Sequence, residues 1–178
     1  MRARFTPPDI PWDAQNLVIG TSRTKHLRGQ DVGATVHSYR GAKIQDLFEV
    51  VLQYPPLDLH SVTLIGGFND HSTQSAYFLI IYQALIDLIK YKFKPRVILA
   101  PKIIECCHNN VINKKLYSLN LSLFNFINNY SYIHNYYPLI VSPYFMLNKK
   151  FFCFDGVHFS RFGNMMFSKM LNTFISRF

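Results

Sequence analysis

Short apolar runs alternate with longer segments of helical periodicity along most of the chain. This pattern predicts strands at 16–19, 34–38, 61–65 and 96–100, the first of them buried, and a fifth strand is expected at 139–141. Between them, apolar residues recur every three or four positions, which predicts helices at 43–54, 75–92, 110–129 and 160–178. Strands that alternate with helices are typical of βαβ units with a parallel sheet, so the expected fold class is α/β.

The length of 178 residues is enough for one domain with a proper core. We expect an N-terminal extension at 1–15 and one domain at 16–178. The most apolar stretch, at 76–89, is interrupted by Gln83 and Asp87 and is too short to cross a bilayer. We therefore expect no transmembrane segment.

The cysteines and the N-terminus favour a reduced compartment. Three cysteines, of which Cys106 and Cys107 are adjacent, do not form the pattern of a disulfide framework. Residues 1–12 lack the apolar run of a secretory signal, which predicts a cytoplasmic protein. Although His108 follows the two cysteines, a zinc site needs spaced ligands and a fourth partner. We expect no metal and no cofactor.

The formal net charge of +9 favours polyanionic partners, either nucleic acid or an anionic membrane surface. The only dense basic run is 90–96, which closes a predicted helix, where cations suit the negative end of the helix dipole. Charge runs of this kind are also common on solvated surfaces. Both interpretations, a solvated surface and a polyanion-binding face, stay open.

Four short motifs follow, or lie close to, predicted structural elements. GTS at 20–22 follows the first strand, Gly41 the second and GFND at 67–70 the third, while DGVH at 155–158 precedes the last helix. Each motif alone is weak, because a Gly-x-Ser after a strand is usually a turn with a capping serine. The carboxyl ends of parallel strands meet at one edge of the sheet, where open α/β folds build their sites. The motifs are therefore expected to converge.

Together the motifs supply the parts of a serine hydrolase. Ser22 is the candidate nucleophile, His158 the base that would take its proton, and Asp155 the group that would orient His158. The N–H groups of Ser22 and Gly41 and the side-chain amide of Asn69 would bind the oxyanion. A glycine at position 41 would let the backbone approach the substrate closely.

In this order the motifs resemble those of the SGNH (GDSL-type) hydrolases. The matching segments are LVIGTS at 17–22, YRGA at 39–42, GFND at 67–70 and DGVHFS at 155–160. The resemblance implies a three-layer α/β/α sandwich around a five-stranded parallel sheet in flavodoxin-like order. It also implies hydrolysis of carboxyl esters, of lipid or acetyl type, through an acyl-serine intermediate. The tail and the segment after the second strand look most like esterase domains of non-LTR retrotransposon proteins.

Thr21 departs from the family pattern, because the family usually has Asp before the serine. This departure and the basic charge support an alternative hypothesis: an SGNH-fold module with little or no activity that binds nucleic acid or anionic membrane. The complete set of catalytic residues favours the enzyme.

Three arginines adjoin the motifs, namely Arg23, Arg40 and Arg161. One interpretation is coincidence in a basic protein. The other is a cationic rim that binds anionic substrates such as phospholipid headgroups, since the guanidinium fork pairs well with phosphate.

Overall fold

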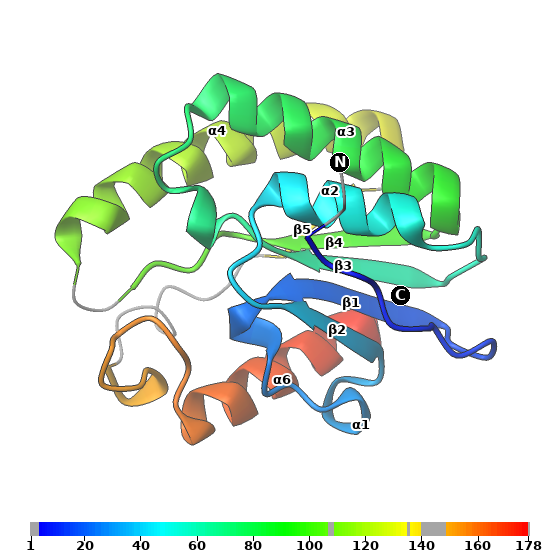
Figure 1. Ribbon diagram of the computed structural model, residues 1–178, viewed down its shortest axis with the longest axis horizontal. Helices are drawn as coiled ribbons and strands as arrows, with labels where there is room; N and C mark the ends of the chain where they lie inside the picture. Colours follow the sequence, from blue (N-terminus) through cyan, green and yellow to red (C-terminus); the bar gives the residue numbers. More distant parts are fainter. Residues whose placement is uncertain (1–3, 107–108, 135, 140–148, 178) are drawn as a thin grey trace.

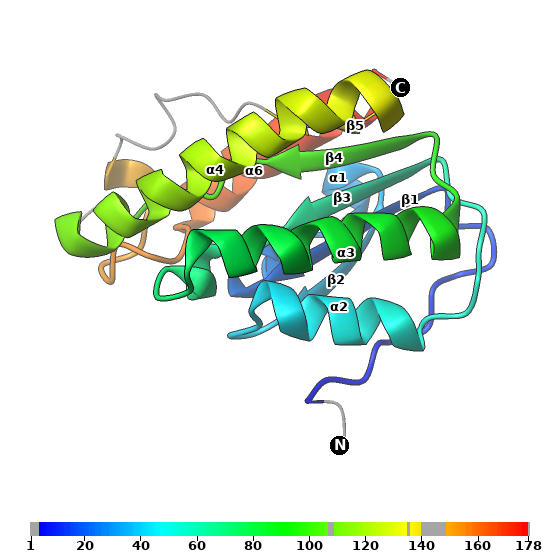
Figure 2. The ribbon, with the colours of Figure 1, turned by 90° about the horizontal axis from the view of Figure 1, so that it is seen from above.

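A parallel sheet lies between two layers of helices in the computed structural model, which describes residues 4–106, 109–134, 136–139 and 149–177 (Figures 1 and 2). The strands follow the order β2-β1-β3-β4-β5 across the sheet. Their bounds are β1 (Asn16–Thr21), β2 (Thr35–Tyr39), β3 (Ser61–Ile65), β4 (Val97–Pro101) and β5 (Tyr136–Leu139). The expected α/β fold, with a parallel sheet flanked by helices, is confirmed.

Each face of the sheet is covered by its own set of helices (Figure 1). One face carries α2 (Ile44–Gln53), α3 (Ser75–Phe93) and α4 (Asn110–His134), and the other carries α1 (Gly29–Val32) and α6 (Arg161–Ile175). Single turns of 3-10 helix in the described residues are η1 (Ser22–Thr24), η2 (Phe68–Asp70) and η3 (Lys149–Phe151). None of the helices in the described residues is long and apolar enough to span a membrane.

The sequence placed some boundaries wrongly. It did not predict α1, a helix of 4 residues. It expected the last strand at 139–141, whereas β5 begins at Tyr136, and residues 140 and 141 lie outside the described residues. Helix α4 continues to His134, beyond the predicted end at 129. Apolar spacing is weakest in this aromatic and Asn-rich part of the chain, which is why the pattern located its elements least well.

The central strands are apolar on both sides because helices cover both faces. Successive side chains of a strand point to opposite faces. In β1, Leu17 and Ile19 therefore pack in the core beneath α2 and α3, while Val18 packs in the core beneath α6. Parallel strands buried on both faces are expected to appear as continuous apolar runs, as they do in this sequence.

The N-terminal stretch lies against the domain. Phe5 packs against the core beneath α2, and its carbonyl oxygen accepts a hydrogen bond from the side chain of Gln53 at 3.0 Å. Arg4 pairs with Asp46 at 3.3 Å. The domain boundary expected after residue 15 stays a prediction.

Two lysines of the basic run 90–96 make local contacts at the end of α3. The ammonium of Lys92 donates to the carbonyl oxygen of Tyr54 at 2.8 Å, and Lys94 pairs with Asp58 at 3.6 Å. The contact of Lys92 satisfies a carbonyl oxygen at the end of α2. The contact of Lys94 is an exposed ion pair.

Candidate active site

The loops at the carboxyl ends of β1, β2 and β3 lie at one edge of the sheet and carry three of the motifs (Figure 1). Ser22 begins η1 directly after β1, Gly41 stands in the turn between β2 and α2, and Asn69 lies in η2 after β3. The segment 149–160, orange in Figure 1, lies at the same edge before α6. The structure therefore brings the four motifs to one edge, although no hydrogen bond joins Ser22 to His158 within the described residues.

The turn that carries Ser22 is fixed by the buried side chain of Thr24. The Thr24 hydroxyl donates to the carbonyl oxygen of Thr21 at 2.8 Å and lies 2.6 Å from the hydroxyl of Ser38 on β2. A Cβ atom at Gly20 would clash with the Thr24 side chain, so only glycine permits this close turn. Ser22 itself is half-buried, whereas Thr21 and Thr24 of the same turn are buried.

Ala42 connects the two other proposed oxyanion donors, the N–H of Gly41 and the side-chain amide of Asn69. The N–H of Ala42 closes a turn by donating to the carbonyl oxygen of Tyr39 at 3.2 Å, and Gly41 has a φ of +71° within that turn. The side-chain amide of Asn69 donates to the carbonyl oxygen of Ala42 at 2.9 Å. An amide nitrogen carries two hydrogens, so one remains for a ligand while the other fixes the amide next to Gly41.

Asp70 anchors the Asn69 turn to the start of α2. Its carboxylate accepts a hydrogen bond from the backbone N–H of Ile44 at 3.1 Å. Burial raises the pKa of Asp70 to about 6, and the hydrogen bond from Ile44 and the charge of Lys43 oppose that rise. The contact satisfies an N–H at a helix start, a group that has no partner within the helix.

Asp155 and His158 lie in a short hairpin before α6. Phe152 and Phe159 form an antiparallel bridge, and the N–H of Cys153 donates to the carbonyl oxygen of His158 at 2.7 Å. Gly156 has a φ of +66°, in the left-handed region that favours glycine, so the chain can reverse there. The sequence DGVH thus places its acid and its imidazole on the same short loop.

The Asp155 carboxylate is bound closely by His158. One carboxylate oxygen lies 2.6 Å from Nδ1 of His158, and the other accepts from the backbone N–H groups of Val157 and His158 at 2.9 and 3.0 Å. Partial burial alone would raise the pKa of Asp155, but the hydrogen bonds from His158 and Val157 lower it to about 2. An ionised carboxylate can only accept, so Nδ1 carries the hydrogen and Nε2 of the neutral ring is left as the acceptor.

The structure separates the three arginines. Arg40 and Arg161 are exposed, as a cationic rim requires. Arg23 is only 4% exposed, which corrects the prediction that it belongs to a solvent-facing rim. Its side chain turns inward because Phe68 and Phe159 offer aromatic faces and the loop after β4 offers carbonyl oxygens. Sequence alone did not indicate that these distant segments meet around it.

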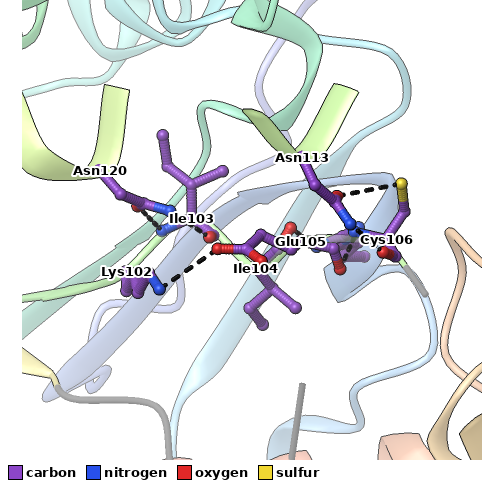
Figure 3. Close-up of polar contacts among 8 residues, drawn as sticks. Lys102, Ile103, Ile104, Glu105, Cys106, Asn113 and Asn120 are labelled. Atoms are coloured by element: carbon purple, nitrogen blue, oxygen red, sulfur yellow. Dashed lines mark hydrogen bonds and ion pairs between the residues drawn. The ribbon is translucent and has the colours of Figure 1, made fainter. Parts of the chain in front are cut away.

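Two asparagines of α4 hold the loop after β4 (Figure 3). The amide of Asn120 accepts from the N–H of Ile103 at 2.8 Å and donates to its carbonyl oxygen at 2.9 Å. The amide of Asn113 makes the same pair of bonds with Cys106, at 2.9 and 2.6 Å. From the sequence alone, the Asn-rich composition of this helix did not indicate a structural role for these residues. The spacing of the two residues, two helical turns apart on one face, was the available signal.

The described residues contain no group of three or more His, Cys, Asp or Glu side chains placed to hold a metal ion. Cys106 is a buried free thiol, while Cys107 and His108 lie outside the described residues.

No protein-family model and no curated protein sequence matches the chain. Solved structures do match. A candidate platelet activating factor protein from Streptococcus pneumoniae has a TM-score of 0.75 at 18% identity, over 91% of this chain and 84% of that one. A carbohydrate esterase of family 3 from Talaromyces cellulolyticus has a TM-score of 0.72 at 10% identity, over 92% and 97%. A GDSL-like lipase from Bacteroides thetaiotaomicron has a TM-score of 0.68 at 14% identity, over 92% and 88%. The chain therefore has the fold of solved esterase and lipase structures.

Proposed function

We propose that this protein is a serine hydrolase of the SGNH (GDSL-type) class that cleaves carboxyl esters. The observation that carries the proposal is the contact of 2.6 Å between Asp155 and His158 in a loop at the same sheet edge as Ser22. The fold shared with esterase and lipase structures supports the same class of reaction. Fold alone does not fix function, so the residues at this edge carry the argument.

In the proposed reaction, Nε2 of His158 takes the hydroxyl proton of Ser22 as Oγ bonds to the carbonyl carbon of the ester. The negative charge passes to the carbonyl oxygen, where the N–H groups of Ser22 and Gly41 and the amide of Asn69 bind it. The carbon–oxygen bond to the alcohol then breaks, and His158 returns the proton to the leaving alkoxide. The alcohol departs and an acyl-serine remains.

Hydrolysis of the acyl-serine repeats the same steps with water. His158 takes a proton from water, the hydroxide bonds to the acyl carbon, and the bond to Ser22 Oγ breaks as His158 returns the proton to it. Asp155 keeps the imidazole in the required tautomer and stabilises the imidazolium that forms in each step. Because the pKa of Asp155 is about 2, its carboxylate is ionised throughout the neutral range.

The expected substrates are lipid or acetyl esters. The exposed Arg40 and Arg161 are the remaining members of the proposed cationic rim, and they would favour substrates with an anionic group near the ester. Substitution of both by Gln should lower turnover of phospholipid-like esters and leave turnover of neutral esters unchanged. If turnover of both kinds of ester fell equally, Arg40 and Arg161 would not select anionic substrates.

Turnover of p-nitrophenyl acetate by the wild type and by Ser22→Ala tests the proposed function. We expect release of p-nitrophenol by the wild type and none above background by the variant, with equal melting temperatures. Ser118→Ala, on the exposed side of α4, is the matched control and should keep full activity. A Ser22→Ala variant as active as the wild type would exclude the mechanism.

A second candidate, a module that binds nucleic acid or anionic membrane, is favoured by the net charge of +9. Binding of RNA or anionic vesicles should then weaken steeply with salt, because each neutralised phosphate releases about 0.7 to 0.9 counterion. A variant with Lys92, Lys94 and Arg96 changed to Gln should lose that binding, and Lys90 is left unchanged because its ammonium nitrogen is buried. No binding by the wild type at low salt would exclude this candidate.

A further inference from the structure

Arg23 links the turn of the proposed nucleophile to the turn of the proposed oxyanion donor. It directly follows Ser22 in η1 and is 4% exposed. Its guanidinium carbon lies 4.2 Å from the centroid of the Phe68 ring, and Phe68 directly precedes Asn69. A guanidinium over an aromatic face is attracted by the ring quadrupole, most strongly where water is excluded.

The same guanidinium reaches the hairpin of the proposed base. Its carbon lies 5.8 Å from the centroid of the Phe159 ring, and Phe159 directly follows His158. The negative charge of Asp155 also acts on Arg23 and favours its charged form. One buried side chain therefore contacts the neighbours of Asn69 and His158 while it is itself the neighbour of Ser22.

The remaining contacts of Arg23 are to a loop that is itself held firmly. Its two terminal nitrogens donate to the carbonyl oxygens of Ile104 and Glu105, the second at 3.4 Å. These residues lie between Ile103 and Cys106, whose backbone groups are bound by the α4 asparagines (Figure 3). The planar fork of the guanidinium thus rests on a fixed segment of backbone.

Stability alone is a weak reason for a cation at this position. Burial lowers the pKa of Arg23 to about 9, and the negative charge of Asp155 opposes that fall. Desolvation therefore costs free energy, yet the group stays charged at neutral pH. Its Nε has no hydrogen-bond partner within the described residues. Well-packed apolar side chains often replace buried charges without loss of stability.

We propose that Arg23 is a positioning residue that holds the Ser22 turn, the Asn69 turn and the His158 hairpin at fixed distances around the loop after β4. The proposal rests on the proposed serine hydrolase function. Arg23 does not contact the substrate in this scheme, because its side chain is buried. Its contribution is geometric, and a misplacement of about 1 Å in an active site can cost about 10²-fold in rate.

The test compares Arg23→Met and Arg23→Lys with the wild type. Arg177→Met is the matched control, since Arg177 is exposed just after the end of α6 and its guanidinium also lies over an aromatic ring, that of Phe174. With p-nitrophenyl acetate, Arg23→Met should lower kcat by about 10- to 10²-fold, with KM changed less than about threefold. Arg23→Lys keeps the cation but lacks the fork, so its kcat should lie between the two. The control should match the wild type.

A measurement that needs no turnover separates this proposal from the proposed function. Amide hydrogen exchange should become faster in the segments 22–25 and 152–160 of Arg23→Met, and stay unchanged in the core strand β3. If the wild type hydrolyses no ester but this exchange pattern appears, the hydrolase function fails and the positioning role stands. The positioning role is refuted if the wild type is active and folded Arg23→Met has the same kcat and the same exchange rates as the wild type.

Discussion

Replacement of Asp155 by Asn tests the assignment of His158 as the base with little change in shape. The carboxylate accepts from Val157 and His158 N–H groups through one oxygen, and an asparagine oxygen can keep both bonds. The other oxygen, which now accepts from Nδ1 of His158 at 2.6 Å, becomes an NH₂ group that can only donate. Nδ1 must then become the acceptor, so the hydrogen moves to Nε2.

An imidazole with its hydrogen on Nε2 cannot take the proton of Ser22. In a Ser-His-Asp triad this wrong tautomer lowers kcat by about 10⁴. That loss corresponds to about 5 kcal/mol of transition-state stabilisation, since each factor of ten is about 1.36 kcal/mol. The effect on stability should be small, within about 1 kcal/mol, because the two side chains are 44% and 49% exposed and solvent screens the pair.

The assay is initial-rate hydrolysis of p-nitrophenyl acetate, with melting temperature as the check on folding. Asp58→Asn is the matched control, because Asp58 is an exposed aspartate that pairs with Lys94. We expect a fall of about 10³ to 10⁴ in kcat for Asp155→Asn and none for the control. More than a tenth of wild-type kcat in a folded Asp155→Asn would refute the reasoning.

Three further predictions concern the loops around the site. Asn69→Ala should lower kcat by about 10²- to 10³-fold with little change in KM, the cost of one oxyanion donor; a rise in KM at constant kcat, seen in steady-state kinetics, would instead make Asn69 a substrate contact. Asp70→Asn should raise the melting temperature at pH 8 but not at pH 4. The reason is that the raised pKa of about 6 makes ionised Asp70 cost stability above that pH, at most about 3 kcal/mol; equal shifts at both pH values would contradict this. Gly41→Ala should cost about 1 to 2 kcal/mol of unfolding free energy from backbone strain at φ +71°, measured by urea denaturation; an unchanged midpoint would show that the turn adapts.

The parts of the fold that repeat a simple physical pattern were predictable from the sequence. Apolar runs located β1, β3 and β4, which are buried because helices cover both faces of the sheet, and helical spacing located α2 and α3. The convergence of the first three motifs followed from their places after parallel strands, whereas DGVH lies before the last helix and no such rule placed it. The roles of the site residues stay predictions, because no hydrogen bond joins Ser22 to His158 within the described residues.

Features that depend on distant parts of the chain were not predictable. One of the two interpretations placed Arg23 in a cationic rim because it adjoins Ser22, yet Phe68 and Phe159 enclose it from segments far away in the sequence. Asn113 and Asn120 looked like part of a composition bias, whereas their amides bind the loop after β4. Such contacts are set by tertiary packing and leave little trace in local periodicity.

Covalent labelling by a fluorophosphonate probe tests the central claim most directly. The probe phosphonylates an activated serine, and peptide mass spectrometry identifies which serine carries the adduct. The account predicts one adduct, on Ser22, which is lost in Ser22→Ala and slowed strongly in His158→Ala, with Asp155→Ala less affected. An adduct on another serine, or labelling that persists in Ser22→Ala, would contradict it.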